Sequence, residues 1–225
     1  MTQEKVNTTV KLVSKIKITS KLKLSFYLRQ KVIIFTALAF FAYNYILFFF
    51  LTWFPSYLTD SRGMSLKLVS VINVIPWTLG FVAIAFGGVF SDFLVKTVFK
   101  NNPLLSRRII IGFGLLLSGV SVFSVVYASS NMLVITLVAI AVFFLYFTGG
   151  IYWGVVDDIV DSSSVGSVGG VMHGIGNCAG ILGPSVTGFI IQFSGSYISA
   201  FILAGIIGIA GAVGALAFIK QIKLA

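Results

Sequence analysis

The sequence predicts an all-α integral membrane protein, a bundle of six transmembrane helices. Of its 225 residues, 58% are hydrophobic and only 10% are charged, and the mean hydropathy is +1.05. A soluble domain carries about 25% charged residues, so this composition excludes one. Two further observations support the prediction. The apolar residues form six segments of membrane-spanning length, and the basic residues gather on one side of those segments.

The six apolar segments each approach the ~20 residues that cross a bilayer core. We place them at 32–58, 68–90, 107–127, 131–153, 165–192 and 197–219. Polar stretches separate them, including a short turn at 59–67 and a longer loop at 91–106. The segments together predict a six-helix transmembrane domain over residues 32–220. Residues 1–31 are basic, and we expect them to lie in the cytoplasm, partly on the membrane surface.

The distribution of Lys and Arg predicts the orientation. With the N-terminus inside, fourteen of the sixteen basic residues fall on the inner side, and only Arg62 and Lys67 fall outside. Cytoplasmic loops carry the excess of basic residues, so we expect a multi-pass protein of the cell membrane with both termini cytoplasmic. The net charge of +10 then reflects topology and contact with the lipid bilayer. It is not a signal of nucleic-acid binding.

Proline and glycine mark local features inside the spans. Pro76 should break or kink the second span and free a carbonyl near Ile72, and Pro184 should do the same in the fifth. Gly166, Gly170 and Gly174 recur every four residues, which gives a stripe where another helix can approach closely. In the last span the glycine spacing of three residues drifts around the helix, which predicts general packing rather than one dimer seam; these are Gly205, Gly208, Gly211 and Gly214.

The residues indicate no enzyme. The chain has one His, His173, and one Cys, Cys178, so it lacks a nucleophile-base-acid set and a multi-cysteine metal site. It also lacks a GxxxxGK[ST] phosphate loop. We therefore expect no catalytic residues, no metal and no cofactor.

Polar side chains at membrane depth are the candidates for a function. His173 lies about 12 Å into its span, at 1.5 Å per residue, and Asn177 follows one turn later. Tyr43 and Asn44 lie together in the middle of the first span, and Trp153 ends the fourth. Each side chain could line a cavity, or could equally hydrogen-bond a neighbouring helix.

Three motifs resemble the major facilitator superfamily. GGVFSD at 87–92, followed by two arginines, is similar to the C-half version of its signature loop, with Gly88, Asp92, Arg107 and Arg108 as the matching residues. YNYILFFFLTWFPSYL with the RGMS turn at 62–65, and GGVMHGIGNCAGILGP, resemble the anion:cation symporter branch. That branch carries organic anions such as hexuronates and glucarate together with protons. The resemblance covers about residues 25–220 and implies the C-terminal six-helix half of the fold, helices seven to twelve.

The resemblance also implies site residues. Trp153 matches a cavity-lining Trp of the tenth helix. His173 stands where the branch commonly has Asn, a departure that could alter substrate choice or pH response. Asn177 matches the following Gly-Asn, and Tyr43 and Asn44 match the central seventh helix less specifically. These five residues are therefore the expected substrate-binding set.

The substrate-clamping Arg and the proton-coupling carboxylate of the family belong to its first six helices. The resemblance thus implies half of a symporter, a truncated or split product or a fragment, whose partner is either the N-terminal half or a second copy of the chain. Two alternatives stay open: a standalone six-helix homodimer, and a non-transporting remnant.

Overall fold

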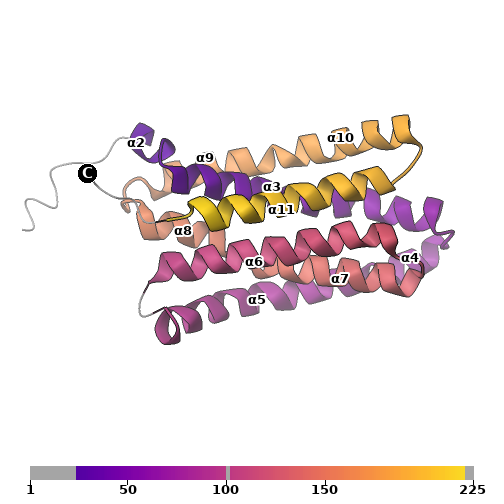
Figure 1. The fold of residues 1–225 in the computed structure, drawn as a ribbon, viewed down its shortest axis with the longest axis horizontal. Coiled ribbons are helices and arrows are strands. Elements are labelled where there is room, and N and C mark those ends of the chain that lie inside the picture. Colours follow the sequence, from indigo (N-terminus) through magenta and orange to yellow (C-terminus); the bar gives the residue numbers. More distant parts are fainter. Residues whose placement is uncertain (1–23, 100–101, 221–225) are drawn as a thin grey trace, which may run out of the picture.

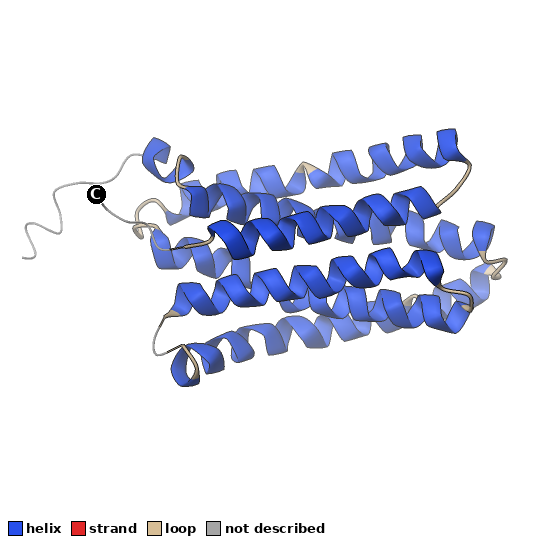
Figure 2. Ribbon diagram, viewed as in Figure 1, coloured by secondary structure: helices blue, strands red, loops and turns tan. Residues whose placement is uncertain are grey.

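The computed structural model describes residues 24–99 and 102–220, and every element in these ranges is helical (Figures 1 and 2). The elements are α2 (Leu24–Leu28), α3 (Lys31–Ser56), η1 (Tyr57–Ser61), α4 (Leu66–Ile72), α5 (Val74–Thr97), α6 (Pro103–Ser124), η2 (Val125–Tyr127), α7 (Asn131–Phe147), α8 (Ile151–Ile159), α9 (Val165–Asn177), α10 (Ala179–Ser194) and α11 (Ile198–Phe218). They form six spans long and apolar enough to cross a membrane: Lys31–Ser61, Leu66–Thr97, Pro103–Tyr127, Asn131–Ile159, Val165–Ser194 and Ile198–Phe218. The predicted six-helix membrane fold is confirmed.

Successive spans run in opposite directions, so alternate connections lie at the same end of the bundle (Figure 1). The two ends differ in charge. We call one of them the basic end, because it carries Arg29, Lys31, Lys96, Arg107, Arg108 and Lys220 among the described residues. The opposite end carries Arg62 and Lys67. This charge difference is the one from which the orientation was predicted.

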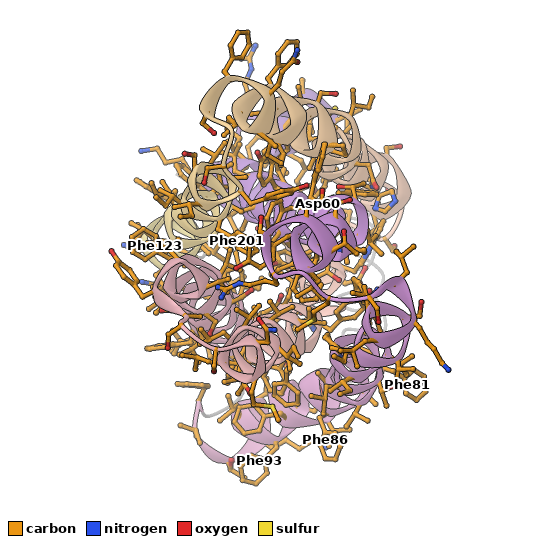
Figure 3. All side chains as sticks on the ribbon, turned by 90° about the vertical axis from the view of Figure 1, so that its right-hand side faces the viewer. Asp60, Phe81, Phe86, Phe93, Phe123 and Phe201 are labelled. Carbon is orange, nitrogen blue, oxygen red and sulfur yellow. The ribbon has the colours of Figure 1, made fainter. Side chains whose placement is uncertain are left out.

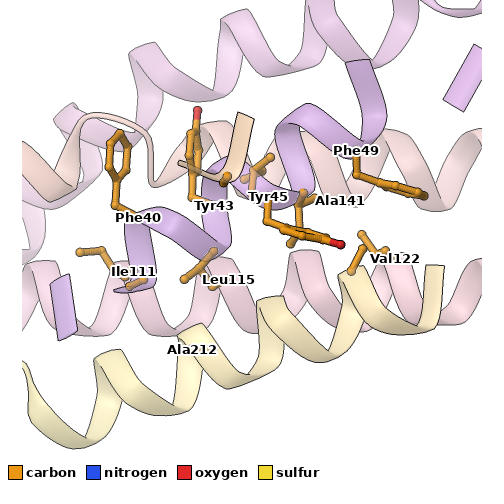
Figure 4. Close-up of a cluster of buried hydrophobic side chains, with 14 of the residues drawn as sticks. Phe40, Tyr43, Tyr45, Phe49, Ile111, Leu115, Val122, Ala141 and Ala212 are labelled. Atoms are coloured by element: carbon orange, nitrogen blue, oxygen red, sulfur yellow. The ribbon is translucent and has the colours of Figure 1, made fainter. Parts of the chain in front are cut away.

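Helix α3 forms the centre of the bundle and packs against α9, α10 and α11. Its side chains Ile46, Phe49 and Phe50 are fully buried. Figure 4 shows Ile111 and Leu115 of α6 on the side of α3 that faces α11. The first span is thus mostly buried by protein, whereas the second and fifth spans keep most of their surface exposed.

Glycine spacing explains how α11 fits between two neighbours. A Cβ at Gly205 would lie 2.8 Å from Phe123 of α6, and one at Gly119 of α6 would lie 2.9 Å from the backbone of α11. Farther along α11, Gly211 and Gly214 face Ala42 and Phe35 of α3. Because a three-residue spacing rotates around the helix, the glycines of α11 face α6 at one end of the helix and α3 at the other, as predicted.

Three spans are interrupted at membrane depth. The second breaks at Asn73, because Pro76 has no N–H for the carbonyl of Ile72. The fourth breaks at 148–150, which includes a Gly-Gly pair, and the fifth breaks at Cys178. The Pro76 prediction is confirmed. The interruption expected from Pro184 lies instead at Cys178, in a glycine-rich stretch, and Pro184 is inside α10.

The predicted loop at 91–106 is wrong. Helix α5 continues to Thr97 and α6 begins at Pro103, so the connection is only 98–102. The two helices stay in contact where they extend beyond the apolar segments: the hydroxyl of Ser106 donates a hydrogen bond to the carbonyl of Ser91 at 3.1 Å. The fourth span likewise extends past Trp153 to Ile159 and includes Asp157 and Asp158.

The end of the basic segment packs on the bundle. Tyr27 of α2 is buried and donates a hydrogen bond to Asp161, in the α8–α9 connection, at 2.6 Å. Burial and this bond to a carboxylate raise the pKa of Tyr27 above its usual value of 10. Residues 1–23, which form most of the segment predicted to lie on the membrane surface, are outside the described residues. The boundary between 1–31 and 32–220 stays a prediction.

Candidate functional site

Trp153 and His173 lie side by side on an exposed face of the bundle. Their ring centroids are 5.5 Å apart, and His173 also stacks on Phe40 of α3 at 5.6 Å. Trp153 comes from α8 and His173 from α9. The two helices can meet here because Gly169 of α9 has no side chain; a Cβ at this position would clash with the Trp153 ring. Trp153 is 41% exposed although it belongs to a membrane span.

Asn177 completes this surface, which we call the polar face: Trp153, His173 and Asn177. The side chain of Asn177 donates a hydrogen bond to the backbone carbonyl of His173 at 2.9 Å, so the two residues share one helical turn. The break at Cys178 follows directly. The polar face thus lies directly before an interruption of the helix, where the N–H of Cys178 still donates a hydrogen bond to the carbonyl of Gly174 at 3.1 Å.

Tyr43 and Asn44 lie behind the polar face rather than on it. Both are buried, with 6% and 5% of their surface exposed. Asn44 donates a hydrogen bond to the carbonyl of Phe40 in its own helix at 3.0 Å. Figure 4 shows the rings of Phe40 and Tyr43 on the same side of α3. The structure therefore separates the five predicted residues into two exposed ones, Trp153 and His173, the half-buried Asn177, and two buried ones.

Aromatic side chains that the sequence analysis did not single out support the set. Tyr43 contacts Tyr152 of α8 and Tyr146 of α7, with ring centroids 5.7 Å and 6.3 Å apart. Tyr146 contacts Trp77 of α5 at 6.2 Å. These rings connect the break in the second span with the polar face. A signal existed for Tyr152, which directly precedes Trp153; none marked Tyr146 or Trp77.

Two glycines bring α9 against the rest of the site. A Cβ at Gly176 would overlap the ring of Phe40 and would lie 3.1 Å from the amide nitrogen of Asn44. By contrast, nothing lies within 4 Å of a Cβ placed at Gly166, Gly170 or Gly174. The glycines of α9 that pack against other helices are therefore Gly169 and Gly176, and the predicted stripe faces no helix in the described residues.

The polar face combines hydrogen-bonding groups with aromatic surface. An indole N–H, an imidazole and a carboxamide can all donate to an oxygen, and none of them carries a negative charge at neutral pH. Ligand sites join apolar and aromatic surface with a few polar groups in this way. Within the described residues, no group of three His, Cys, Asp or Glu side chains could hold a metal ion.

The signature residues lie at the basic end. Arg107 forms an ion pair with Asp158 of α8, with Nε and Oδ2 3.1 Å apart and both side chains about one-fifth exposed. A Cβ at Gly154 would overlap the Arg107 guanidinium, so the guanidinium can lie against α8 only because residue 154 has no side chain. Asp92 is exposed and pairs with no described basic residue. A Cβ at Gly88 would meet nothing within 4 Å, whereas its neighbour Gly87 is packed against α7.

Comparison with known proteins gives the family. No family model matches the chain. It is 47% identical to a hexuronate transporter of Bacillus subtilis strain 168 over 220 residues, which are 98% of this chain and 52% of that protein. It is 37% identical over 162 residues to a probable galactarate/D-glucarate transporter of Escherichia coli K12, covering 72% of this chain and 36% of that protein. A probable L-galactonate transporter of the same strain is 29% identical over 184 residues, 82% and 40% of the two chains.

These relatives are transporters, in agreement with the prediction that the chain is not an enzyme. The chain spans about half the length of the hexuronate transporter, as expected for a C-terminal half, and a smaller share of the other two. The similarity extends over nearly all of the chain and agrees with the motifs and the six spans. The chain therefore belongs to the sugar-acid branch of the major facilitator superfamily.

Proposed function

We propose that this chain is the C-terminal half of a carrier that moves a sugar acid, or a similar organic anion, across the cell membrane together with protons. The observation that carries the proposal is the 47% identity to a hexuronate transporter over 98% of the chain. Substrate sites of this superfamily lie between two six-helix halves near the bilayer midplane. The chain supplies one side of such a site.

The polar face is the proposed contribution to that site. It is exposed although it lies at membrane depth, which is an expensive position for polar side chains unless they line a cavity. We infer that the N–H groups of Trp153 and Asn177 and the imidazole of His173 contact the carboxylate and hydroxyl groups of the anion. Tyr43 and Asn44 then act from behind by supporting Phe40 and the α8 rings.

Transport by a half-carrier requires its second half; the alternative to this proposal is a homodimer, in which a second copy of this chain takes that place. The proton-coupling carboxylate is expected from the other half, because the polar face carries no acidic side chain. We further propose that the basic end faces the cytoplasm, since it carries most of the positive charge. Alternating access would then expose the polar face to each side of the membrane in turn.

Replacing Trp153 with Ala tests the polar face. The chain would be reconstituted with the N-terminal half of the Bacillus subtilis hexuronate transporter, and proton-gradient-driven uptake of labelled glucuronate would be measured. We expect Trp153→Ala to lower uptake about tenfold, because an aromatic contact to the substrate is worth roughly 1–2 kcal/mol. Phe193→Ala is the control, since Phe193 is 84% exposed on α10, and its uptake should stay within about twofold of the unmodified protein. Equal effects of the two substitutions would contradict the proposed site.

A further inference from the structure

A pocket of about 280 Å³ lies at the end of the bundle opposite the basic end. It forms where η1, η2 and the α10–α11 connection meet, and we call it the Arg62 pocket. Figure 3 views the bundle from this end and shows Phe201, which lines the pocket, near the centre of the bundle. The main polar and aromatic lining residues are Tyr57, Ser61, Arg62, Ser196, Tyr197 and Phe201.

Arg62 is held in place by contacts on two sides. Its Nε donates a hydrogen bond to the Tyr57 hydroxyl at 2.8 Å, and its Nη2 donates to the carbonyl of Ala128 at 2.7 Å. The guanidinium also lies over the Tyr57 ring, 5.5 Å from its centroid. Gly63 follows with φ +64°, which lets the chain turn away from the arginine. The charged group is therefore preorganised at the pocket.

Among the described residues, no acidic side chain forms an ion pair with Arg62. The ion pair found there joins Arg107 and Asp158. Asp60, two residues before Arg62, does not line the pocket. Its carboxylate instead accepts hydrogen bonds from Tyr197 at 2.9 Å and Thr59 at 2.8 Å.

Tyr197 holds the carboxylate of Asp60 in a hydrogen bond. Burial, together with its hydrogen bond to Asp60, raises the pKa of Tyr197 to about 12. The hydroxyl therefore stays protonated at neutral pH and keeps donating to the carboxylate. The carboxylate of Asp60 is thus satisfied by hydroxyls. The guanidinium of Arg62 keeps unused N–H donors, since five are available and two form the bonds above.

We propose that the Arg62 pocket binds the carboxylate group of a small organic acid. A guanidinium presents paired N–H groups that match the two oxygens of a carboxylate. Ser61 and Ser196 offer hydroxyls for polar substituents, and Tyr57 and Phe201 offer aromatic surface for the carbon skeleton. The volume lies just below the usual range for ligand pockets, about 300–1,000 Å³, which favours a compact acid over a large one.

The pocket is separate from the polar face. Its lining residues come from the ends of the first, third, fifth and sixth spans, whereas the polar face lies beyond the break at Cys178, toward the basic end. The pocket would capture the anion before it reaches the central site. Binding there does not require the chain to transport anything, so the two proposals can fail independently.

Trp53 is a natural reporter of this pocket. Its ring contacts Tyr197, with centroids 6.4 Å apart, and its indole donates to the Pro184 carbonyl at 3.2 Å. The chain has three tryptophans, so Trp77→Phe with Trp153→Phe leaves Trp53 alone and removes Trp153 from the polar face. Glucuronate would be titrated into this purified variant while Trp53 fluorescence is measured. Glucose, the uncharged analogue, and sodium chloride would be titrated in parallel.

We expect a saturable response to glucuronate and none to glucose or chloride over the same range. Arg62→Gln should raise the Kd for glucuronate at least about tenfold, whereas Lys67→Gln, which removes the same charge from an exposed neighbour, should leave it within about twofold. Ser61→Leu provides an independent test if Arg62→Gln fails to fold, because it fills the pocket and leaves both Arg62 anchors intact; it should also abolish the response. An equal response to glucose or chloride, or a Kd unchanged by Arg62→Gln or by Ser61→Leu, would overturn the proposal.

Discussion

Gly87→Ala should destabilise the protein by about 3 kcal/mol, the upper range for overpacking. A Cβ at this position would overlap the carbonyl oxygen of Phe147, at the end of α7. A backbone carbonyl cannot move aside as a side chain can, so α5 and α7 would have to separate. The measurement is the free energy of unfolding of the purified chain in mixed detergent micelles.

The adjacent glycine is a matched control. Gly88 lies in the same helix, and a Cβ there would meet nothing within 4 Å. Gly88→Ala should therefore change stability by no more than about 1 kcal/mol, in the stabilising direction, because Ala favours the helix over Gly. If both substitutions destabilised the protein equally, the close approach of α5 and α7 would be wrong.

The second large effect is expected for Asp158→Asn. Arg107 would keep its charge in a mostly buried position and lose its only ionic partner among the described residues. Its Nη1 is already buried without a hydrogen bond. The cost should be about 2 kcal/mol, between that of a surface pair and that of a fully buried one. The same unfolding measurement reports it.

Asp157 supplies the control for this prediction. It precedes Asp158, is exposed and forms no ion pair in the described structure. Asp157→Asn should change stability by less than about 0.5 kcal/mol. A loss of similar size in both variants would show that charge at the end of α8, rather than the specific pair with Arg107, stabilises the fold.

The spans could be predicted because hydropathy and length report them directly. Their ends were less predictable, since a helix that leaves the apolar layer gives no hydropathy signal. Residues 91–97 show this: they are polar enough to suggest a loop, yet they continue α5. The break at Asn73 could be predicted from Pro76, whereas no proline marks the breaks at 148–150 and Cys178.

The candidate residues could be named from the sequence, but which of them are exposed and which are buried could not. The resemblance identified Trp153 and His173, and the structure places their rings in contact. It could not indicate that Asn44 is buried, because that depends on how closely Gly176 lets α9 approach. Arg107 and Asp92 were matched to the same signature loop, whereas the ionic partner of Arg107 is Asp158, which lies 51 residues further along the chain.

Uptake by the chain alone and with a partner tests the central claim most directly. Labelled glucuronate uptake would be measured in proteoliposomes that contain this chain, the N-terminal half of the Bacillus subtilis hexuronate transporter, or both. The account predicts proton-driven uptake only when both are present, and loss of most of it with Trp153→Ala. Uptake by this chain alone would contradict the half-carrier proposal and favour a homodimer. No uptake from the folded pair would contradict a transport function.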